Sequence, residues 1–346
     1  MNPLDKVAIG DTGVSVSRLG LGGAPLSGMV LGGGLYGGTA RDAAMAIIRR
    51  AHELGISYFD TAPLYGTGRS EARYAGVLPE LDRDSFVISS KCGRVLVPED
   101  GPDDDFRGDG LPRLDVQFDL SADGIRRSVD ESLARLKLNS IEILYLHDPD
   151  VVPGDGMSLA LNSALPAMVK LREEGIVKAI GCGMNLWEWP AEFIRNFDLD
   201  IILLAGRFTL LDHDAYDEFL PLCAERNVKL AIGGPYNSGI LARDLDGPVT
   251  FNYEAPEQRW IDRARALKAV CDRHNVDLKA AALQYVMAHP VVASVIPGAQ
   301  TEQEVEQNIQ MASANIPADL WSEMKQEKLI PSDAPTPGQG HRIEPV

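Results

Sequence analysis

The sequence predicts an α/β protein built as a single (β/α)8 barrel with long loops at its C-terminal face. Short apolar runs alternate with helical patterns from the N-terminus to about residue 311. Most of these runs lack polar alternation, which is typical of parallel strands buried on both faces. Eight such runs, each followed by a helix or a long loop, favour one barrel over two separate domains, although the chain has 346 residues.

The predicted strands share short length and β-branched or leucine-rich composition. They are Leu19–Gly23, Ser57–Thr61, Phe86–Ser90, Glu142–His147, Lys178–Cys182, Ile201–Ala205, Lys229–Ile232 and Ala293–Ile296. Between them, apolar residues at helical spacing predict helices such as Arg41–Leu54 and Ala122–Leu136. Gly55 and Gly175 stand where a helix is expected to end before the next strand.

Three segments depart from this regular pattern. The glycine-rich stretch Leu26–Thr39 and the long loop Gly93–Asp119 both follow strands, so both are expected at the C-terminal face of the barrel. The long loop carries an acidic run, which we expect to be a solvated tip: Glu99, Asp100, Asp103, Asp104 and Asp105. The barrel is expected to span residues 1–330, and the proline-rich tail Pro331–Val346 to be irregular, either disordered or lying across a face.

The net charge of the chain and its lack of long apolar runs argue against nucleic acid and membranes as partners. The chain has 33 Lys and Arg against 50 Asp and Glu, a net charge of −17, which argues against nucleic acid and anionic membranes. The beginning of the chain lacks an apolar signal region, and no run of about 18 apolar residues occurs. We therefore expect a cytoplasmic protein that acts on a small molecule.

The four cysteines show no metal-binding or disulfide pattern. They are Cys92, Cys182, Cys223 and Cys271, and no two of them form a CxxC pair. We expect each to behave as a small buried apolar residue that is dispensable for catalysis. No metal site is predicted.

A glycine pattern near the N-terminus matches a dinucleotide-binding motif but lacks its context. Gly32, Gly34 and Gly37 fit G-x-G-x-x-G, and Glu53 follows farther on. The motif requires a preceding strand and a tight turn into a helix, and neither is predicted there. We interpret this stretch as a loop beside the mouth of the barrel.

Polar side chains that end apolar strands predict a catalytic site. Asp60, Lys91 and His147 each close a predicted strand, and Tyr65 follows Asp60 by five residues. Any one of them could be structural, but strand ends of a barrel converge on one mouth. A buried Asp and Lys there are tolerable only as a pair. A tyrosine, whose usual pKa is about 10, can move a proton beside that ammonium, and a histidine can orient a substrate oxygen.

These residues lie in motifs that resemble the aldo-keto reductase family over about residues 19–308. The matching segments are 59–71 around the tyrosine, Ser90-Lys91, 144–148, 178–181 and 296–299. The resemblance implies a nicotinamide cofactor lying across the strand ends and hydride transfer without a metal. It also implies that Tyr65 is the general acid and base, that Lys91 and Asp60 tune it, and that His147 orients the substrate oxygen.

The chain departs from the family where the nicotinamide is held. Members commonly have Ser-Asn after the fifth strand, Gln in the sixth and a stacking aromatic residue after the seventh. This chain has Gly183-Met184 followed by Asn185, then Ala205 and Gly233. We expect the nicotinamide to be held by backbone groups or by Asn185, Arg207 or Asn237. The full set of predicted cofactor contacts is Gly22, Gly23, Asp60, Asn185, Gly233, Pro235, Asn237, Ser238, Gly298, Gln300, Thr301, Glu304 and Asn308.

The segment after the eighth strand predicts a preference for NAD over NADP. Members that hold the 2′-phosphate place a Lys directly after Ile-Pro and an Arg six residues later. Here these positions are Gly298 and Glu304, and Glu302 and Glu306 add negative charge. A nearly dianionic phosphate would meet repulsion instead of a charge-assisted contact.

Two further segments, residues 203–211 and 233–241, resemble a bacterial subgroup of dehydrogenases. The subgroup includes D-threo-aldose, L-fucose and galactose dehydrogenases, which act at C1, and the related pyridoxal 4-dehydrogenase. It implies NAD-dependent oxidation of the cyclic hemiacetal of an aldose to a lactone. The alternatives are oxidation of pyridoxal to 4-pyridoxolactone, NADPH-dependent aldehyde reduction, and a cofactor-sensing regulatory subunit with little turnover. The sequence predicts neither the oligomeric state nor the individual aldose.

Overall fold

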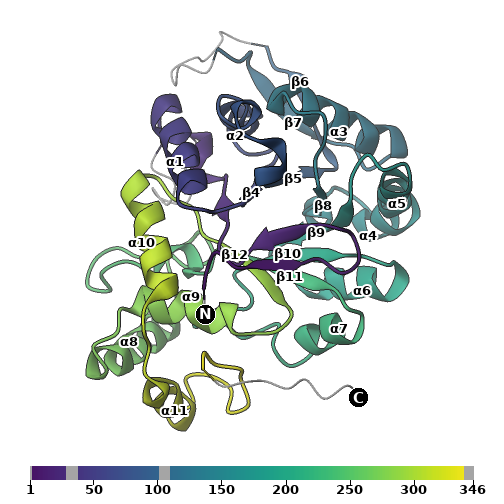
Figure 1. Ribbon diagram of the computed structural model, residues 1–346. Coiled ribbons are helices and arrows are strands. Elements are labelled where there is room, and N and C mark those ends of the chain that lie inside the picture. The colour runs from purple at the N-terminus through teal and green to yellow at the C-terminus, as the bar shows by residue number, and fades with distance from the viewer. Residues whose placement is uncertain (1, 29–37, 101–109, 339–346) are drawn as a thin grey trace.

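The computed structural model describes residues 2–28, 38–100 and 110–338, and within them eight parallel strands form a barrel ringed by helices (Figure 1). The expected barrel is confirmed. Leu19 bridges Val295 and Gly22 bridges Gly298, both in parallel, so the first strand joins the last. The strands in sheet order are β3 (Leu21–Gly22), β4 (Tyr58–Asp60), β5 (Val87–Cys92), β8 (Ile143–His147), β9 (Ala179–Met184), β10 (Ile201–Ala205), β11 (Lys229–Gly233) and β12 (Val292–Ile296).

Helices lie between the strands. They are α1 (Arg41–Glu53), α2 (Arg69–Tyr74), α3 (Ala122–Leu136), α4 (Gly156–Leu159), α5 (Leu165–Glu173), α6 (Glu188–Asn196), α7 (Phe219–Glu225), α8 (Gln258–Arg273), α9 (Leu278–Met287), α10 (Glu302–Ser313) and α11 (Ala318–Gln326). The two named from apolar spacing, Arg41–Leu54 and Ala122–Leu136, correspond to α1 and α3. Helix α3 begins and ends where predicted. The Ser121 side chain caps its first turn by accepting a hydrogen bond from the Gly124 amide, and Lys137 ends it in a left-handed conformation. None of the described helices is long and apolar enough to span a membrane.

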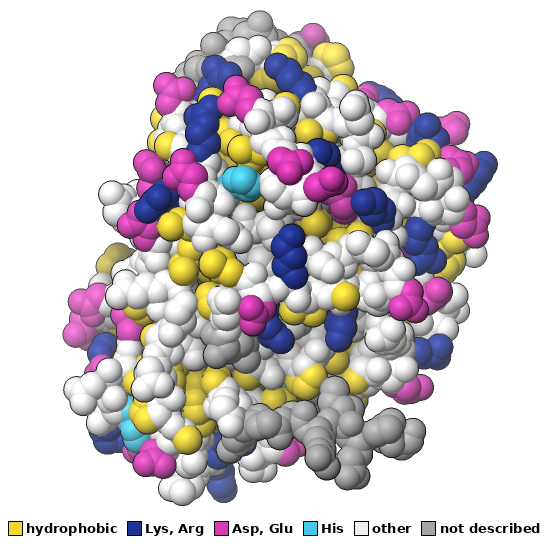
Figure 2. Space-filling model, viewed as in Figure 1, with side chains coloured by type: hydrophobic (Ala, Val, Ile, Leu, Met, Phe, Trp, Pro, Cys, Tyr) yellow, Lys and Arg dark blue, Asp and Glu magenta, His cyan; other side chains and the backbone are white. Residues whose placement is uncertain are grey.

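An N-terminal hairpin, absent from the predicted elements, covers the N-terminal end of the barrel. It pairs β1 (Lys6–Ala8) with β2 (Ser15–Ser17) in antiparallel fashion. Ile9, Val14 and Val16 are buried against the residues that begin the barrel strands, among them Tyr58 and Ile143. Figure 1 looks onto this end with the hairpin in front, and Figure 2 shows the same face. The mouth formed by the carboxyl ends of the strands therefore lies on the far side.

A second hairpin corrects the interpretation of residues 93–119 as a loop. β6 (Arg94–Pro98) and β7 (Leu114–Phe118) pair in antiparallel register, with Arg94 opposite Phe118. The alternation Leu-Asp-Val-Gln-Phe in β7 is the pattern of a half-buried strand, so the signal was present. At the tip, exposed Glu99 pairs with Arg113, with 2.7 Å between the carboxylate and guanidinium.

Parts of three predicted segments lie outside the described residues. These are Asp103, Asp104 and Asp105 of the acidic run, Gly32, Gly34 and Gly37 of the rejected glycine motif, and the end of the tail from residue 339. The described part of the tail, residues 331–338, has no helix or strand. It nevertheless buries Ala334 and Thr336, so this part lies against the body of the protein.

Candidate active site

Four predicted residues meet at the mouth of the barrel. Asp60 and His147 are the last residues of β4 and β8, and Lys91 is the penultimate residue of β5. Tyr65 lies in the turn between β4 and α2. Gly66 follows it with φ 64° and leaves no room for a side chain, because a Cβ there would lie 2.7 Å from the Ser27 carbonyl oxygen. This tight turn fixes the position of the tyrosine.

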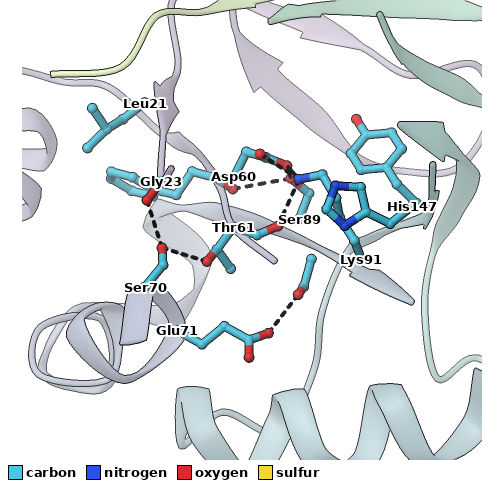
Figure 3. Close-up of polar contacts among 12 residues, drawn as sticks. Leu21, Gly23, Asp60, Thr61, Ser70, Glu71, Ser89, Lys91 and His147 are labelled. Atoms are coloured by element: carbon cyan, nitrogen blue, oxygen red, sulfur yellow. Dashed lines mark hydrogen bonds and ion pairs between the residues drawn. The ribbon is translucent and has the colours of Figure 1, made fainter. Parts of the chain in front are cut away.

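Lys91 and Asp60 form a buried ion pair (Figure 3). Nζ of Lys91 lies 2.8 and 2.7 Å from the two Asp60 carboxylate oxygens and donates to the Thr61 carbonyl at 2.9 Å. Ser89 donates to Asp60 Oδ1 at 2.7 Å. Burial raises the pKa of the Asp60 carboxyl, whereas the Lys91 ammonium and the Ser89 hydroxyl oppose that rise. The Lys91 ammonium thus donates to both Asp60 oxygens and to the Thr61 carbonyl, and these bonds fix it beside Tyr65.

The Tyr65 ring lies close to both Lys91 and His147. The ammonium nitrogen of Lys91 is 4.8 Å from the centroid of the Tyr65 ring. The rings of Tyr65 and His147 meet edge to face, with centroids 5.9 Å apart and an interplanar angle of 89°. A positive charge this close favours the deprotonated form of a phenol over the neutral form. The arrangement can therefore move a proton at the tyrosine hydroxyl.

His147 is buried and neutral. Burial, together with the positive charges of Lys91 and Arg94, lowers the pKa of His147 well below its ordinary value of 6.5. Its Nε2 lies 3.4 Å from a carboxylate oxygen of Asp148, and its Nδ1 forms no hydrogen bond within the described part of the chain. A neutral imidazole offers one donor and one acceptor, so it can hold a substrate oxygen without itself acting as a strong acid.

Two adjoining cavities open at this mouth. The first, of about 480 Å³, is bordered by Tyr65, Lys91 and His147. The second, of about 200 Å³, is bordered by Asp60 and Tyr65 and extends toward the start of α10. Residues common to both walls join them: Ala24, Tyr65, Leu203, Ala205 and Tyr253. A small molecule in the first cavity and an extended one in the second would meet at Tyr65.

The predicted cofactor contacts divide between these cavities and their supports. Those that border the second cavity are Gly22, Gly23, Asp60, Gly233, Pro235, Ser238, Gly298, Gln300 and Glu304. Asn185 borders the first cavity instead. Asn237, Thr301 and Asn308 border neither cavity, nor does Arg207.

Three of the residues that border neither cavity, Asn237, Thr301 and Asn308, stabilise the walls of the second cavity. Asn237 is buried, accepts a hydrogen bond from Thr209 and donates to the Gly206 carbonyl at 3.1 Å. Thr301 caps α10 by accepting a hydrogen bond from the Glu304 amide. Asn308 accepts a hydrogen bond of 2.8 Å from Tyr236, which borders the second cavity. The side-chain oxygen of each of these three residues thus accepts a hydrogen bond from the protein.

Tyr253 is a wall residue that sequence reasoning missed. It borders both cavities, is 45% exposed, and has a left-handed backbone with φ 67°. Its amide donates to Ser238 Oγ at 3.1 Å, which ties it to the turn after β11. It lies in an irregular segment with no strand before it, so no periodic pattern points to it. The resemblance predicts a stacking aromatic residue where this chain has Gly233; Tyr253, from another loop, borders the same second cavity as Gly233.

None of the four cysteines borders either cavity. All four cysteines are buried, and burial raises the pKa of each thiol. The described residues contain no group of three or more His, Cys, Asp or Glu side chains that could hold a metal ion.

Comparisons with known proteins show which proteins this chain is similar to. The model of the aldo/keto reductase family matches residues 18–328. A D-threo-aldose 1-dehydrogenase from a Pseudomonas species is 40% identical, over 92% of this chain and 96% of the relative. The pyridoxal 4-dehydrogenase of Microbacterium luteolum is 36% identical, over 94% and 98%. An aldo-keto reductase of Bacillus halodurans, solved in its holo form, superposes with a TM-score of 0.72 at 25% identity, over 97% of this chain and 98% of that chain.

Proposed function

The chain belongs to the aldo/keto reductase family and is an oxidoreductase, and we propose that it is an NAD-dependent dehydrogenase that oxidises C1 of a cyclic aldose to the lactone. One observation carries the proposal most directly. Tyr65, with the Lys91 ammonium 4.8 Å from its ring centroid, stands where the two cavities meet. The 40% identity to an aldose 1-dehydrogenase supports the choice of substrate class.

The second cavity suits an extended dinucleotide. Its wall is rich in glycine, including Gly22, Gly233 and Gly298, so a ligand can approach the backbone closely. It runs from Tyr65 to Gln300 and Glu304 at the start of α10. These residues would hold the nicotinamide cofactor of the family. When bound, the nicotinamide ring of NAD⁺ takes up the hydride that leaves C1.

Tyr65 removes the proton from the hydroxyl on C1 while the C1–H bond breaks. The proton passes to the tyrosine oxygen, and the C1–O bond becomes the carbonyl of the lactone. The Lys91 ammonium favours the phenolate that accepts this proton, and Asp60 and Ser89 keep the ammonium in place. Because a tyrosine must be deprotonated, the oxidation is expected to quicken toward alkaline pH.

His147 holds the oxygen that loses its proton. It borders the first cavity, its ring meets that of Tyr65, and burial keeps it neutral. A neutral imidazole can donate one hydrogen bond to the substrate oxygen while Tyr65 takes the proton. Part of the cavity wall beside these groups is apolar and includes Leu64, Met184 and Leu203.

The preference for NAD is supported by the charges around the second cavity. Asp60 and Glu304 are the charged side chains among its described wall residues, and neither Lys nor Arg occurs there. Oε2 of Glu304 accepts a hydrogen bond of 2.7 Å from the Gln300 amide, which fixes the carboxylate at the start of α10. A carboxylate there repels a 2′-phosphate and can accept hydrogen bonds from free ribose hydroxyls.

A substrate panel tests the proposal. Aldoses of the L-fucose, D-arabinose and galactose types, together with pyridoxal, are each offered with NAD⁺ and with NADP⁺, and absorbance at 340 nm is followed. We expect an aldose with NAD⁺ to give the highest kcat/KM. Pyridoxal is the second candidate, because the relative at 36% identity is a pyridoxal 4-dehydrogenase and the cavity wall is partly apolar. A preference for NADP⁺, or activity only in aldehyde reduction, would contradict the proposal.

A further inference from the structure

Arg94 and Asp148 form an ion pair at the edge of the first cavity that the mechanism above does not use. Nη2 of Arg94 donates to Oδ2 of Asp148 at 3.0 Å, and the two side chains are 10% and 23% exposed. Asp148 borders the cavity, whereas Arg94 begins β6 of the outer hairpin. A carboxylate in the wall of the substrate cavity is therefore held by a cation from outside the barrel.

Arg94 is itself fixed from two sides. Its guanidinium carbon lies 4.9 Å from the centroid of the Phe118 ring, which is its register partner on β7. Ser128 of α3 donates to the Arg94 carbonyl at 3.2 Å. The ring of Phe118 and the carboxylate of Asp148 thus orient the planar guanidinium, while Ser128 holds the Arg94 backbone.

The backbone of Asp148 directs the carboxylate toward His147. Asp148 has a left-handed conformation, φ 42° and ψ 60°, and its amide donates to the Gly183 carbonyl at 3.1 Å. Asp adopts this region more readily than most residues. Oδ2 is shared between Arg94 and His147 Nε2, at 3.0 and 3.4 Å. Oδ1 accepts no hydrogen bond from the described residues, so one strong acceptor is left for a ligand.

We propose that Asp148 selects polyhydroxylated substrates, with its carboxylate accepting a hydrogen bond from the C2 hydroxyl of the aldose. This inference rests on the proposed oxidation at C1. His147 holds the oxygen on C1, and Asp148 Oδ2 lies 3.4 Å from the His147 ring nitrogen. The carboxylate is therefore in place for a hydroxyl on the neighbouring carbon. In the cyclic form of pyridoxal, the corresponding carbon belongs to the aromatic ring and carries no hydroxyl.

Arg94 acts as a positioning residue through the charge of Asp148. The charged and titratable groups around Asp148 are Arg94 of β6, Lys91 of β5, His147 of β8 and Asp150 beyond it. Burial raises the pKa of Asp148 to about 6; Asp150 adds to the rise, and Arg94 and Lys91 oppose it. The ionised form accepts the stronger hydrogen bond. The kcat/KM for an aldose should therefore fall as the pH decreases through about 6.

The experiment compares an aldose with its 2-deoxy analogue in the wild type and in Asp148→Ala. A charge-assisted hydrogen bond predicts that the wild type prefers the aldose by about 10- to 100-fold in kcat/KM. In Asp148→Ala this preference should fall toward unity, while NADH affinity measured by fluorescence changes little. The melting temperature should fall, because Arg94 loses its buried partner. Asp150→Asn is the matched control, because Asp150 does not border the cavity, and it should keep the preference. Asp148→Asn gives a second, nearly isosteric variant if the alanine variant does not fold.

Arg94 variants test the positioning role. Arg94→Met should move the acid limb of the aldose pH profile to higher pH, because a positive charge that lowers the pKa of Asp148 is lost. Arg94→Lys should restore most of the profile. An unmoved limb in Arg94→Met would overturn this role.

The outcomes separate this inference from the proposed function. If the wild type oxidises aldoses and Asp148→Ala retains the preference over the 2-deoxy analogue, the role of Asp148 is wrong and the proposed function stands. An equal loss for both sugars would also overturn the role. If the wild type oxidises pyridoxal and no aldose, the proposed substrate class fails, and the role of Asp148 fails with it.

Discussion

Two buried ion pairs stand on opposite sides of β5. Lys91 faces the barrel interior and pairs with Asp60, whereas Ser90, one residue earlier, faces outward and donates to Glu71 at 2.8 Å. Glu71 also accepts from Arg135 of α3 at 2.6 Å (Figure 3 shows Glu71 on this outer side). Successive strand residues point to opposite faces, so neighbouring positions serve two different environments.

The difference between the pairs lies in what borders them. Both carboxylates are at most 3% exposed, so burial and pairing do not distinguish them. Lys91 and Asp60 border the cavities and approach Tyr65, whereas Glu71 and Arg135 border neither cavity. A buried ion pair therefore indicates catalysis only where a cavity and a group that can exchange a proton adjoin it.

The largest expected effect comes from removing that proton-exchanging group. Tyr65→Phe should lower kcat by about 10²- to 10⁴-fold, because a phenyl ring cannot accept the proton. Single-turnover kinetics measure the chemical step, and NADH fluorescence should show nearly unchanged cofactor affinity. The matched control is Tyr74→Phe, a buried tyrosine that borders neither cavity, which should keep most of the activity. A Tyr65→Phe enzyme with more than about a tenth of the wild-type rate would refute the role.

The two ion pairs can be compared directly. Lys91→Met and Arg135→Met each leave a buried carboxylate unpaired, so each should lower the free energy of unfolding by about 3–5 kcal/mol. Only Lys91→Met should also lower kcat per folded molecule, by about 100-fold, because the charge beside Tyr65 is lost. Urea unfolding and active-site titration separate the two effects. Equal kcat losses in both variants would show that the distinction drawn from the cavities is wrong.

A smaller effect is expected where a charge borders the second cavity. Glu304→Lys should shift the ratio of kcat/KM for NADP⁺ over NAD⁺ by about 10- to 100-fold toward NADP⁺, because repulsion becomes a charge-assisted contact. Glu302→Lys is the control, since Glu302 shares the first turn of α10 without bordering the cavity. Both variants lose a similar favourable interaction with the helix dipole. An equal shift of the cofactor ratio in both variants would indicate a long-range effect of charge instead of a direct contact with the 2′-phosphate.

No effect on activity is expected from modifying the cysteines. All four are buried and none borders either cavity, and burial raises the pKa of each thiol, so the reactive thiolate is scarce. Native enzyme treated with iodoacetamide should keep its activity, with mass spectrometry reporting the extent of labelling. Rapid inactivation that substrate prevents would place a cysteine beside the reaction after all.

The barrel strands were predictable because each is a continuous apolar run. All eight predicted ranges overlap observed strands, and the polar residues that end three of them meet at one mouth. The N-terminal hairpin was missed because β1 and β2 have three residues each, too few to show a period. The β6–β7 hairpin interrupts a stretch that was interpreted as one loop, which also hid Arg94.

Individual cofactor contacts were less predictable than the strands. A polar residue after a strand gives the same sequence pattern whether its side chain faces a cavity or bonds to the residues of the cavity wall. Asn237 and Asn308 are examples, because their side chains bond to Thr209 and Tyr236 instead of facing open space. No sequence pattern predicts Tyr253 as a wall residue, because an irregular loop brings it to the mouth of the barrel.

The closure of the barrel between Leu19 and Val295 also sets an order for folding during synthesis. The first strand has its second neighbour only in the last, and Ile9, Val14 and Val16 pack against strands up to Ala293. At about 5–20 residues per second, roughly 14–55 s separate the synthesis of the two sides of this seam. Throughout that interval one edge of β3 has no partner, and the apolar face of the hairpin lacks Ala293 and Ile296 of its cluster. We therefore expect the nascent chain to depend on chaperones until its last strand emerges, and truncation after α9 to yield aggregates.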